Sequence, residues 1–300
     1  MKSFGNKLFT AVMLLCILAA GSGILQRAEG GAETGSAFPA GTRGGERVTP
    51  VRITGGIVPH HDIALGMIQR FYEHLGSPEV RRVWLLSPDH FRRARTFAAL
   101  CPDDWPTPER LLMADREACE TLSSLSVAGA DGALFRREHG ITVHIPFVAR
   151  HFPNASVVPM VIGARTPDLA LIILKNAILD LLRDGDVIIL SMDLSHYKTP
   201  EAMAAEDRRT LDVLANIRPA GTKTIDVDAR RAAALVLMLF REVGIEKGTV
   251  IEHADTSSVL GRRVESGTSY AAILYGTAGE GTSGKPPSSE ADIIVKEYKD

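Results

Sequence analysis

The chain has 300 residues and 45% of them are hydrophobic, so it can bury a large core in one α/β domain or two smaller ones. Its formal net charge of −2 argues against nonspecific nucleic-acid binding, which requires a concentrated basic surface. The arginine pairs at 81–82, 92–93 and 136–137 are typical of solvated faces, and the sequence shows no internal repeat.

The N-terminal segment has the features of an export signal. Lys2 and Lys7 precede an apolar run over residues 8–20, which small residues follow. This pattern predicts a signal peptide over residues 1–23 and export to the periplasm or another extracytoplasmic compartment. The alternative is an uncleaved inner-membrane anchor over residues 8–25, because a membrane span needs about 20 apolar residues.

Composition divides the rest of the chain into three parts. Residues 24–49 are rich in glycine, alanine and charge, which predicts a flexible linker, and the polar residues 279–300 are predicted to be a disordered tail. Residues 50–278 are predicted to form one compact domain. Within it, Cys101 and Cys119 are either a disulfide, which export permits, or two buried free thiols.

Strand and helix patterns alternate along this domain. Short apolar runs bounded by turn residues predict strands, and apolar residues at helical spacing predict helices. The predicted order is strand 51–58, helix 63–75, strand 83–86, helix 109–125, strand 157–162, helix 167–183, strand 187–190, helices 199–216 and 229–243, and strands 250–252 and 270–274. Such alternation indicates an α/β fold with a largely parallel or mixed sheet flanked by helices.

Seven of the nine histidines lie in five short segments, and most of these segments follow a predicted strand. They are His60 and His61, His90, His139 and His144, His196, and His253. In open α/β sheets, ligands bind in the crevice outside the carboxyl ends of the strands. Histidine is the commonest metal ligand and also a general acid or base near neutral pH. The pattern therefore predicts a chemical site at the strand ends.

His60 and His90 are the predicted metal ligands, because each follows a strand and a proline turn. Two imidazoles on separate strands can converge on one metal ion at roughly 2.0–2.1 Å. The alternative is that each imidazole only satisfies a loop carbonyl group. His61 and Asp89 stand beside these two histidines and are predicted to support them from the crevice wall.

Asp193 and His196 are the predicted acid and base pair. They are three residues apart just beyond a buried strand, and a carboxylate can orient an imidazole that then moves a proton. The alternative is that Asp193 caps the following turn. Glu138, His139 and His144 are further crevice residues whose separation would not bring both imidazoles to one face of a continuous helix.

His253 and Asp255 are possible third metal ligands, since they would share one face of an extended segment. A hydroxyl-rich turn is the alternative interpretation of this segment. Other chemistries lack their motifs: the sequence has no Gly-x-Ser-x-Gly nucleophile elbow, phosphate-binding loop or dinucleotide-binding glycine pattern.

The order of these segments resembles the Memo-like family, whose prokaryotic members are called AmmeMemoRadiSam system protein B. The resemblance covers about residues 50–276. It is carried by Val58-Pro59-His60, Leu86-Ser87-Pro88-Asp89-His90, Glu138-His139-Gly140-Ile141-Thr142-Val143-His144-Ile145-Pro146-Phe147, Val158-Pro159-Met160-Val161-Ile162-Gly163, Ser191-Met192-Asp193-Leu194-Ser195-His196-Tyr197 and Ser269-Tyr270-Ala271-Ala272.

The resemblance implies a fold like that of the class III extradiol dioxygenases, which hold non-haem Fe(II) with two histidines and a carboxylate. By resemblance, His60 and His90 take the histidine positions and His196 that of the acid/base histidine. Fe(II) is the implied metal, with copper or zinc as alternatives. The third ligand of animal Memo proteins is implied to be a cysteine, and a gap-free comparison places Val259 there. Asp255 or His253 is then the candidate substitute.

Two functions follow from these expectations. The first is a metal-binding, dioxygenase-like enzyme, and the second is a non-catalytic module that binds a small molecule or peptide in the same crevice. The resemblance also implies an association with radical-SAM and AMMECR1-like proteins. No nucleic-acid partner is expected, and a membrane is expected only if residues 8–25 are retained.

Overall fold

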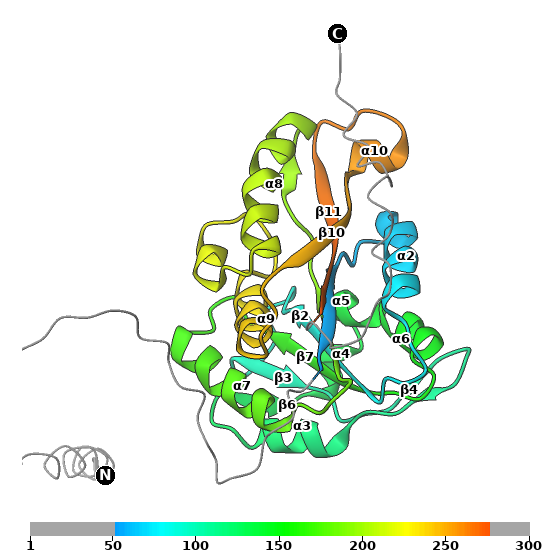
Figure 1. Ribbon diagram of the computed structural model, residues 1–300, viewed down its shortest axis with the longest axis vertical. Coiled ribbons are helices and arrows are strands. Elements are labelled where there is room, and N and C mark those ends of the chain that lie inside the picture. The colour runs from blue at the N-terminus through cyan, green and yellow to red at the C-terminus, as the bar shows by residue number, and fades with distance from the viewer. Residues whose placement is uncertain (1–51, 277–300) are drawn as a thin grey trace, which may run out of the picture. The chain divides into compact units, whose positions relative to one another are not determined.

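The computed structural model describes residues 52–276, which form one mixed β-sheet with helices on both faces (Figure 1). The sheet has nine strands in the order β10-β11-β1-β8-β2-β7-β3-β6, with β9 paired to β11. They are β1 (Thr54–Val58), β2 (Arg82–Pro88), β3 (Ala98–Leu100), β6 (Ala128–Ala130), β7 (Ser156–Ile162), β8 (Val187–Ser191), β9 (His196–Lys198), β10 (Gly248–Asp255) and β11 (Gly267–Gly276). A separate hairpin joins β4 (Trp105–Pro106) to β5 (Leu111–Leu112).

The centre of the sheet is parallel and its flanks are antiparallel. Strand β8 lies between β1 and β2 and is parallel to both, and β2 is parallel to β7. Strand β11 pairs antiparallel with β1, and β3 pairs antiparallel with β7. Every residue of β2 and β8 is buried. This includes Arg82, for which the prediction of a solvated face was wrong: its guanidinium pairs with the buried Asp186 carboxylate at 2.6 Å. Parallel strands covered on both faces require such continuous apolar sequence, and this is why short apolar runs mark them.

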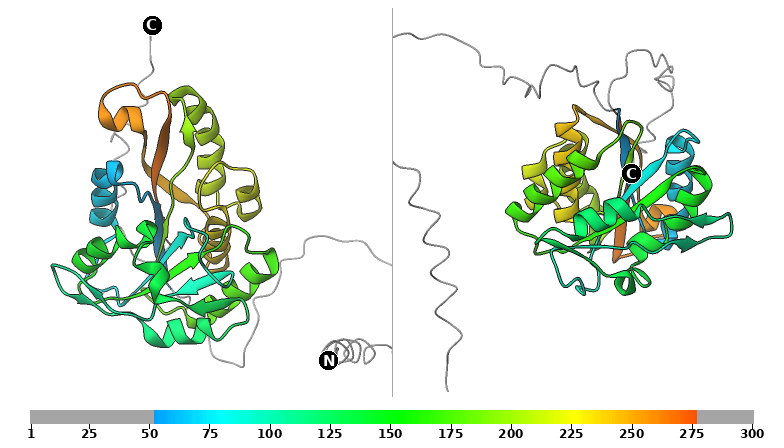
Figure 2. Two further views of the ribbon diagram at one scale, coloured as in Figure 1. Left: turned by 180° about the vertical axis from the view of Figure 1, so that it is seen from behind. Right: turned by 90° about the horizontal axis from the view of Figure 1, so that it is seen from below.

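Helices cover both faces of the sheet (Figure 2). One face packs against α3, α7, α8 and α9, and the other against α2, α4, α5 and α6. The helical segments are η1 (Asp62–Ala64), α2 (Leu65–Leu75), α3 (Arg116–Ser123), α4 (Gly132–Phe135), α5 (His139–Thr142), α6 (Ile145–His151), α7 (Asp168–Leu181), α8 (Pro200–Ala215), η2 (Pro219–Lys223), α9 (Arg230–Glu242) and α10 (Thr256–Leu260). The prediction of a single α/β domain with a mixed, helix-flanked sheet is confirmed.

One predicted helix was wrong in its first half. Residues 109–125 were predicted to be helical throughout, but α3 begins only at Arg116, after strand β5. The Asp115 carboxylate accepts a hydrogen bond from the Ala118 N–H and caps the helix there. Upstream, Ala114 forms a parallel bridge with Val157 near the beginning of β7, so tertiary pairing replaces the first helical turns.

The two cysteines of the domain are buried free thiols. Cys101 packs in the core on the α2 face and Cys119 in the core on the α3 face, so the sheet separates their side chains. Burial raises the pKa of Cys101 to about 11 and that of Cys119 to about 12. Of the two alternatives from sequence, the structure therefore has the pair of thiols.

The predicted signal peptide, linker and tail, at residues 1–23, 24–49 and 279–300, lie outside the described residues. Among residues 52–276, no helix is both long and apolar enough to cross a membrane.

Candidate metal centre

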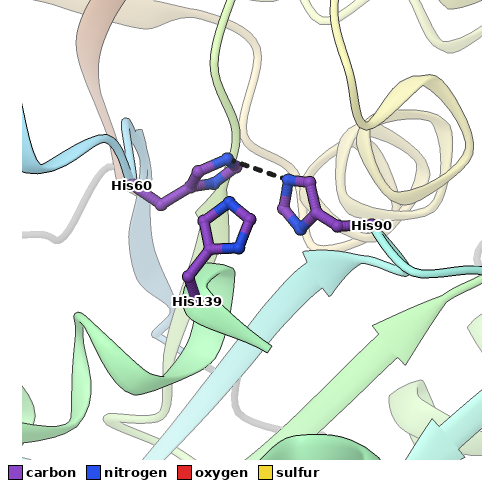
Figure 3. A group of neighbouring side chains, drawn as sticks. All are labelled: His60, His90 and His139. Carbon is purple, nitrogen blue, oxygen red and sulfur yellow. Dashed lines mark hydrogen bonds between the residues drawn. The ribbon is translucent and has the colours of Figure 1, made fainter. Parts of the chain in front are cut away.

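Three adjacent parallel strands place the candidate site at one edge of the sheet. His60 follows β1, His90 follows β2, and Asp193 follows β8, which lies between them. The carboxyl ends of parallel strands meet at the same edge, so residues separated by more than one hundred positions come together. Figure 3 shows His60, His90 and His139 around one point above the strand ends.

His60 and His90 direct one ring nitrogen each toward the other. Their Nε2 atoms are 3.1 Å apart. The opposite nitrogen of each ring is occupied: His60 Nδ1 lies 2.9 Å from Ser191 Oγ, and His90 Nδ1 donates to Glu138 Oε1 at 2.5 Å. Because the buried Glu138 carboxylate can only accept, the proton of neutral His90 is held on Nδ1. The Nε2 lone pair is then free to bind a ligand.

Asp228 completes this arrangement, and sequence reasoning missed it. Its Oδ2 atom lies 3.0 Å from His60 Nε2 and 3.5 Å from His90 Nε2. The residue stands in the loop just before α9, and the two imidazoles are the ion-pair partners of its carboxylate among the described residues. In the sequence, the only feature that marks Asp228 is its position shortly before an apolar predicted helix. Asp226 gives the same signal, so only the fold distinguishes the two.

These three residues fit a metal ion. Their ligand atoms are 3.0, 3.1 and 3.5 Å apart, and atoms about 2.1 Å from one metal are about 3.0 Å apart at a 90° angle. Three lone pairs directed at one point repel each other unless a cation or protons lie between them. Two histidines and a carboxylate on one face are the ligand set of non-haem Fe(II) oxygenases.

Nearby charges shift the pKa values of these residues. Burial lowers the pKa of His60, but Asp228 and Asp193 together raise it above its ordinary value. Burial opposes the rise at His90 too, yet Asp228 and Glu138 raise its pKa to about 9. Burial would raise the pKa of Asp228, but the two imidazoles hold it well below its usual range. The carboxylate is therefore ionised at neutral pH and supplies negative charge to a cation.

His139 forms the open side of the site. Its ring centroid is 4.0 Å from that of His90 and 5.1 Å from that of His60, and half of its side chain is exposed. The ring nitrogens of these three histidines include atoms all within 4.8 Å of one another. Burial and the neighbouring imidazoles lower the pKa of His139 to about 4, so its ring is neutral at pH 7.

Asp193 and His196 lie beside the three converging atoms. Asp193 Oδ1 accepts the backbone N–H of His60 at 3.1 Å, and its Oδ2 is 4.0 Å from His196 Nε2. His196 Nδ1 lies 2.8 Å from the Leu194 carbonyl oxygen, which can only accept. In the neutral ring of His196 the proton is therefore on Nδ1, and the lone pair is on Nε2, the nitrogen 4.0 Å from Asp193. Burial raises the pKa of Asp193.

Two other predicted metal ligands have partners elsewhere. His253 Nε2 is 2.9 Å from Asp207 Oδ2, and Asp255 caps α10 by accepting from the Ser258 N–H at 2.7 Å. Among residues 52–276, two groups of residues have converging ligand atoms: His60, His90 and His139, and His60, Asp193 and Asp228. Neither His253 nor Asp255 belongs to them. Val259 lies on α10 with 40% of its surface exposed.

The remaining predicted crevice residues have different roles. His61 Nδ1 accepts from the Ile63 N–H at 3.3 Å, and the Asp89 carboxylate accepts from the backbone of the loop after His90. His144 is fully buried, and neither ring nitrogen has a partner in the described part of the chain. Its ring centroid is 5.8 Å from that of Tyr72. It therefore lies in the core and not on the crevice wall.

Comparison with known proteins identifies the family. The family model described as Memo-like protein matches residues 44–274. The chain belongs to the Memo-like family. A MEMO1 family protein of Ignicoccus hospitalis is 28% identical over 247 residues, which cover 76% of this chain and 85% of that protein. One from Methanobrevibacter smithii is 33% identical over 147 residues, covering 47% and 51% of the two chains.

Among solved structures, the uncharacterized protein JW3007 of Escherichia coli K12 has a TM-score of 0.46 at 12% identity, over 74% of this Memo-like chain and 99% of that one. The family model over residues 44–274 confirms the family resemblance inferred from the sequence motifs.

Proposed function

We propose that this Memo-like protein is a metal-dependent oxidoreductase of the extradiol dioxygenase type, with Fe(II) held by His60, His90 and Asp228. The observation that carries the proposal is the convergence of two imidazole nitrogens and a carboxylate oxygen within 3.0–3.5 Å of one another. Oxygen and nitrogen donors favour iron over copper(I), which prefers sulfur ligands.

Asp228 removes the reason for assigning the chain a purely non-catalytic role. Valine at the third-ligand position would favour that role, because Val259 cannot bind a metal, but Val259 lies on α10 and Asp228 is the residue beside the two histidines. An acidic third ligand in place of a thiolate retains the charge that balances a divalent cation. The ligand set is then complete without His253 or Asp255.

The chain's own residues supply proton transfer. A bound Fe(II) would supply the redox chemistry by which a catechol reacts with dioxygen. His196 is the proposed base: with the proton of the neutral ring on Nδ1, its Nε2 beside Asp193 would remove a proton from a substrate hydroxyl group. Asp193 lies 4.0 Å away and stabilises the imidazolium that forms. Extradiol cleavage inserts both atoms of dioxygen into the product, so it requires no further reductant.

The first test is metal affinity, measured without oxygen by competition between the purified protein and a chelator for Fe(II). Asp228→Asn removes the ligand charge and is expected to weaken the affinity by at least about tenfold. Asp255→Asn is the matched control, because it makes the same change at a residue that caps α10. Equal affinities of the two variants, or no Fe(II) binding by the unmodified protein, would overturn the ligand assignment.

The second test is oxygen consumption by the Fe(II)-loaded protein with a panel of catechols. Turnover that is lost in His196→Gln supports the enzyme. Catechol binding without oxygen consumption supports the alternative, a small-ligand binding module on the same fold.

A further inference from the structure

Two aspartates stand just before α9, and only one of them lies beside the converging histidines. Asp228 pairs with His60 and His90, whereas the carboxylate of Asp226 pairs with Lys198. Lys198 Nζ is 2.8 Å from Asp226 Oδ2, and 31% of each side chain is exposed. Lys198 belongs to β9, and Asp226 comes two residues before Asp228. The ion pair therefore connects β9 to the segment that carries the third proposed metal ligand.

This segment, residues 224–229, presents its two aspartates on one side. Every second residue from 225 to 229 is buried in the core, and the aspartates between them are partly exposed. The backbone N–H of Asp228 donates to the carbonyl oxygen of Asp193 at 3.4 Å, which is long for such a bond. The core residues hold one side of the segment, so the position of the other side depends on contacts such as that of Asp226. The core residues are Ile225, Val227 and Ala229.

Strand β9 gives the Lys198 side chain a fixed base. The strand pairs antiparallel with β11. The buried Ser195 stands just before it and donates its hydroxyl hydrogen to Asp207 Oδ1 of α8 at 3.0 Å. Lys198 Nζ also lies 3.6 Å from Glu206 Oε1 of the same helix. The sheet and α8 therefore both hold the cation that Asp226 meets.

Arg230 is the second cation near Asp226, but it belongs to the start of α9 itself. Its Nη2 lies 3.6 Å from Asp226 Oδ1, and its Nε donates to the Ile225 carbonyl oxygen at 2.7 Å. These contacts shape the turn into α9 without attaching it to another element. Within residues 52–276, Lys198 is the cation from another element that pairs with Asp226.

We infer that Lys198, through its ion pair with Asp226, positions Asp228 as a metal ligand. The inference rests on the proposed function and adds two positioning residues that do not themselves bind the metal. A bond from a metal to a carboxylate oxygen is only about 2.0–2.2 Å long, so a small shift of the segment breaks it. Without the ion pair, the segment spends part of its time with Asp228 out of reach, and the apparent affinity falls by that fraction.

The test is the Fe(II) affinity of the full chain, measured without oxygen by competition with a chelator. Lys198→Met and Asp226→Asn are each expected to weaken the affinity about three- to fivefold, the effect of losing one partly exposed ion pair. The double variant Lys198→Met/Asp226→Asn should lose no more than either single variant, because both changes remove the same interaction. Direct attraction or repulsion of the metal predicts otherwise: loss of the lysine charge alone would strengthen binding, and the double variant, whose net charge is unchanged, would bind normally.

Lys175→Met is the matched control. Lys175 Nζ pairs with Glu242 Oε1 at 2.7 Å and joins α7 to the end of α9 that lies farther from Asp228. The control is expected to keep its Fe(II) affinity within about 1.5-fold of the original, and urea unfolding checks that every variant is folded in the assay.

Stronger binding by Lys198→Met, a double variant that binds normally, or losses that multiply in the double variant would overturn the positioning role alone. In that case Asp228→Asn would still weaken binding. Failure of the unmodified protein to bind Fe(II) would instead overturn the proposed function.

Discussion

His144 gives a prediction of how acid destabilises the fold. Its imidazole is fully buried, and no described residue bonds to either ring nitrogen. Burial, with a smaller contribution from His60, lowers the pKa of His144 to about 3 from an ordinary value of 6.5. His144→Leu replaces the ring with an apolar side chain that loses no hydrogen bond. The variant should therefore be at least as stable as the original at pH 7.5.

The sign follows from comparing the folded and unfolded chains. Between pH 6.5 and about 3 the unfolded chain takes up a proton at His144 that the folded chain excludes. The contribution of neutral His144 to stability is complete above pH 6.5 and is lost as the pH falls toward 3. Each pH unit in that interval costs about 1.4 kcal/mol, so acidification from pH 7.5 to 4.5 costs about 3 kcal/mol through this residue.

Urea unfolding of the metal-free protein at pH 7.5 and 4.5, followed by tryptophan fluorescence, measures this cost. His144→Leu is expected to lose about 3 kcal/mol less unfolding free energy than the original protein between the two pH values. Other titrating histidines are common to both proteins and cancel in the comparison. His74→Gln, a change at an exposed histidine of α2, is the control and should follow the original protein. If His144→Leu loses as much stability as the original, the reasoning is refuted.

Three further outcomes are expected. Glu138→Gln should weaken Fe(II) affinity by about 10- to 100-fold in chelator competition, because the carboxylate orients a ligand imidazole; unchanged affinity would contradict this role. His253→Ala should leave Fe(II) affinity within about twofold of that of the original protein. It should lower the unfolding free energy by about 1–3 kcal/mol, because the buried Asp207 carboxylate loses one hydrogen-bond partner. A large loss of affinity would restore His253 as a ligand. In the native protein, peptide mapping after thiol labelling should find Cys101 and Cys119 unmodified, and rapid labelling without denaturant would contradict their burial.

Local pattern predicted the strands and helices that have strong periodicity. The apolar runs at 83–86 and 157–162 correspond to β2 and β7, and the segment at 229–243 to α9. Short elements such as β3 and β6 escaped prediction because three residues carry no periodicity. The helix predicted from residue 109 begins later because Ala114 pairs with Val157 of β7. A local pattern cannot reveal pairing with a residue about forty positions away.

The sequence by itself determined the fold class, the family and the strand-end histidines, because buried strands and the turns that follow them have recognisable local patterns of residues. Only the tertiary structure showed that His60, His90 and Asp228 converge, since strand order decides which loops meet at the sheet edge. The choice between Asp228 and the candidates His253 and Asp255 depends on where α9 and β10 pack. No local pattern encodes that packing.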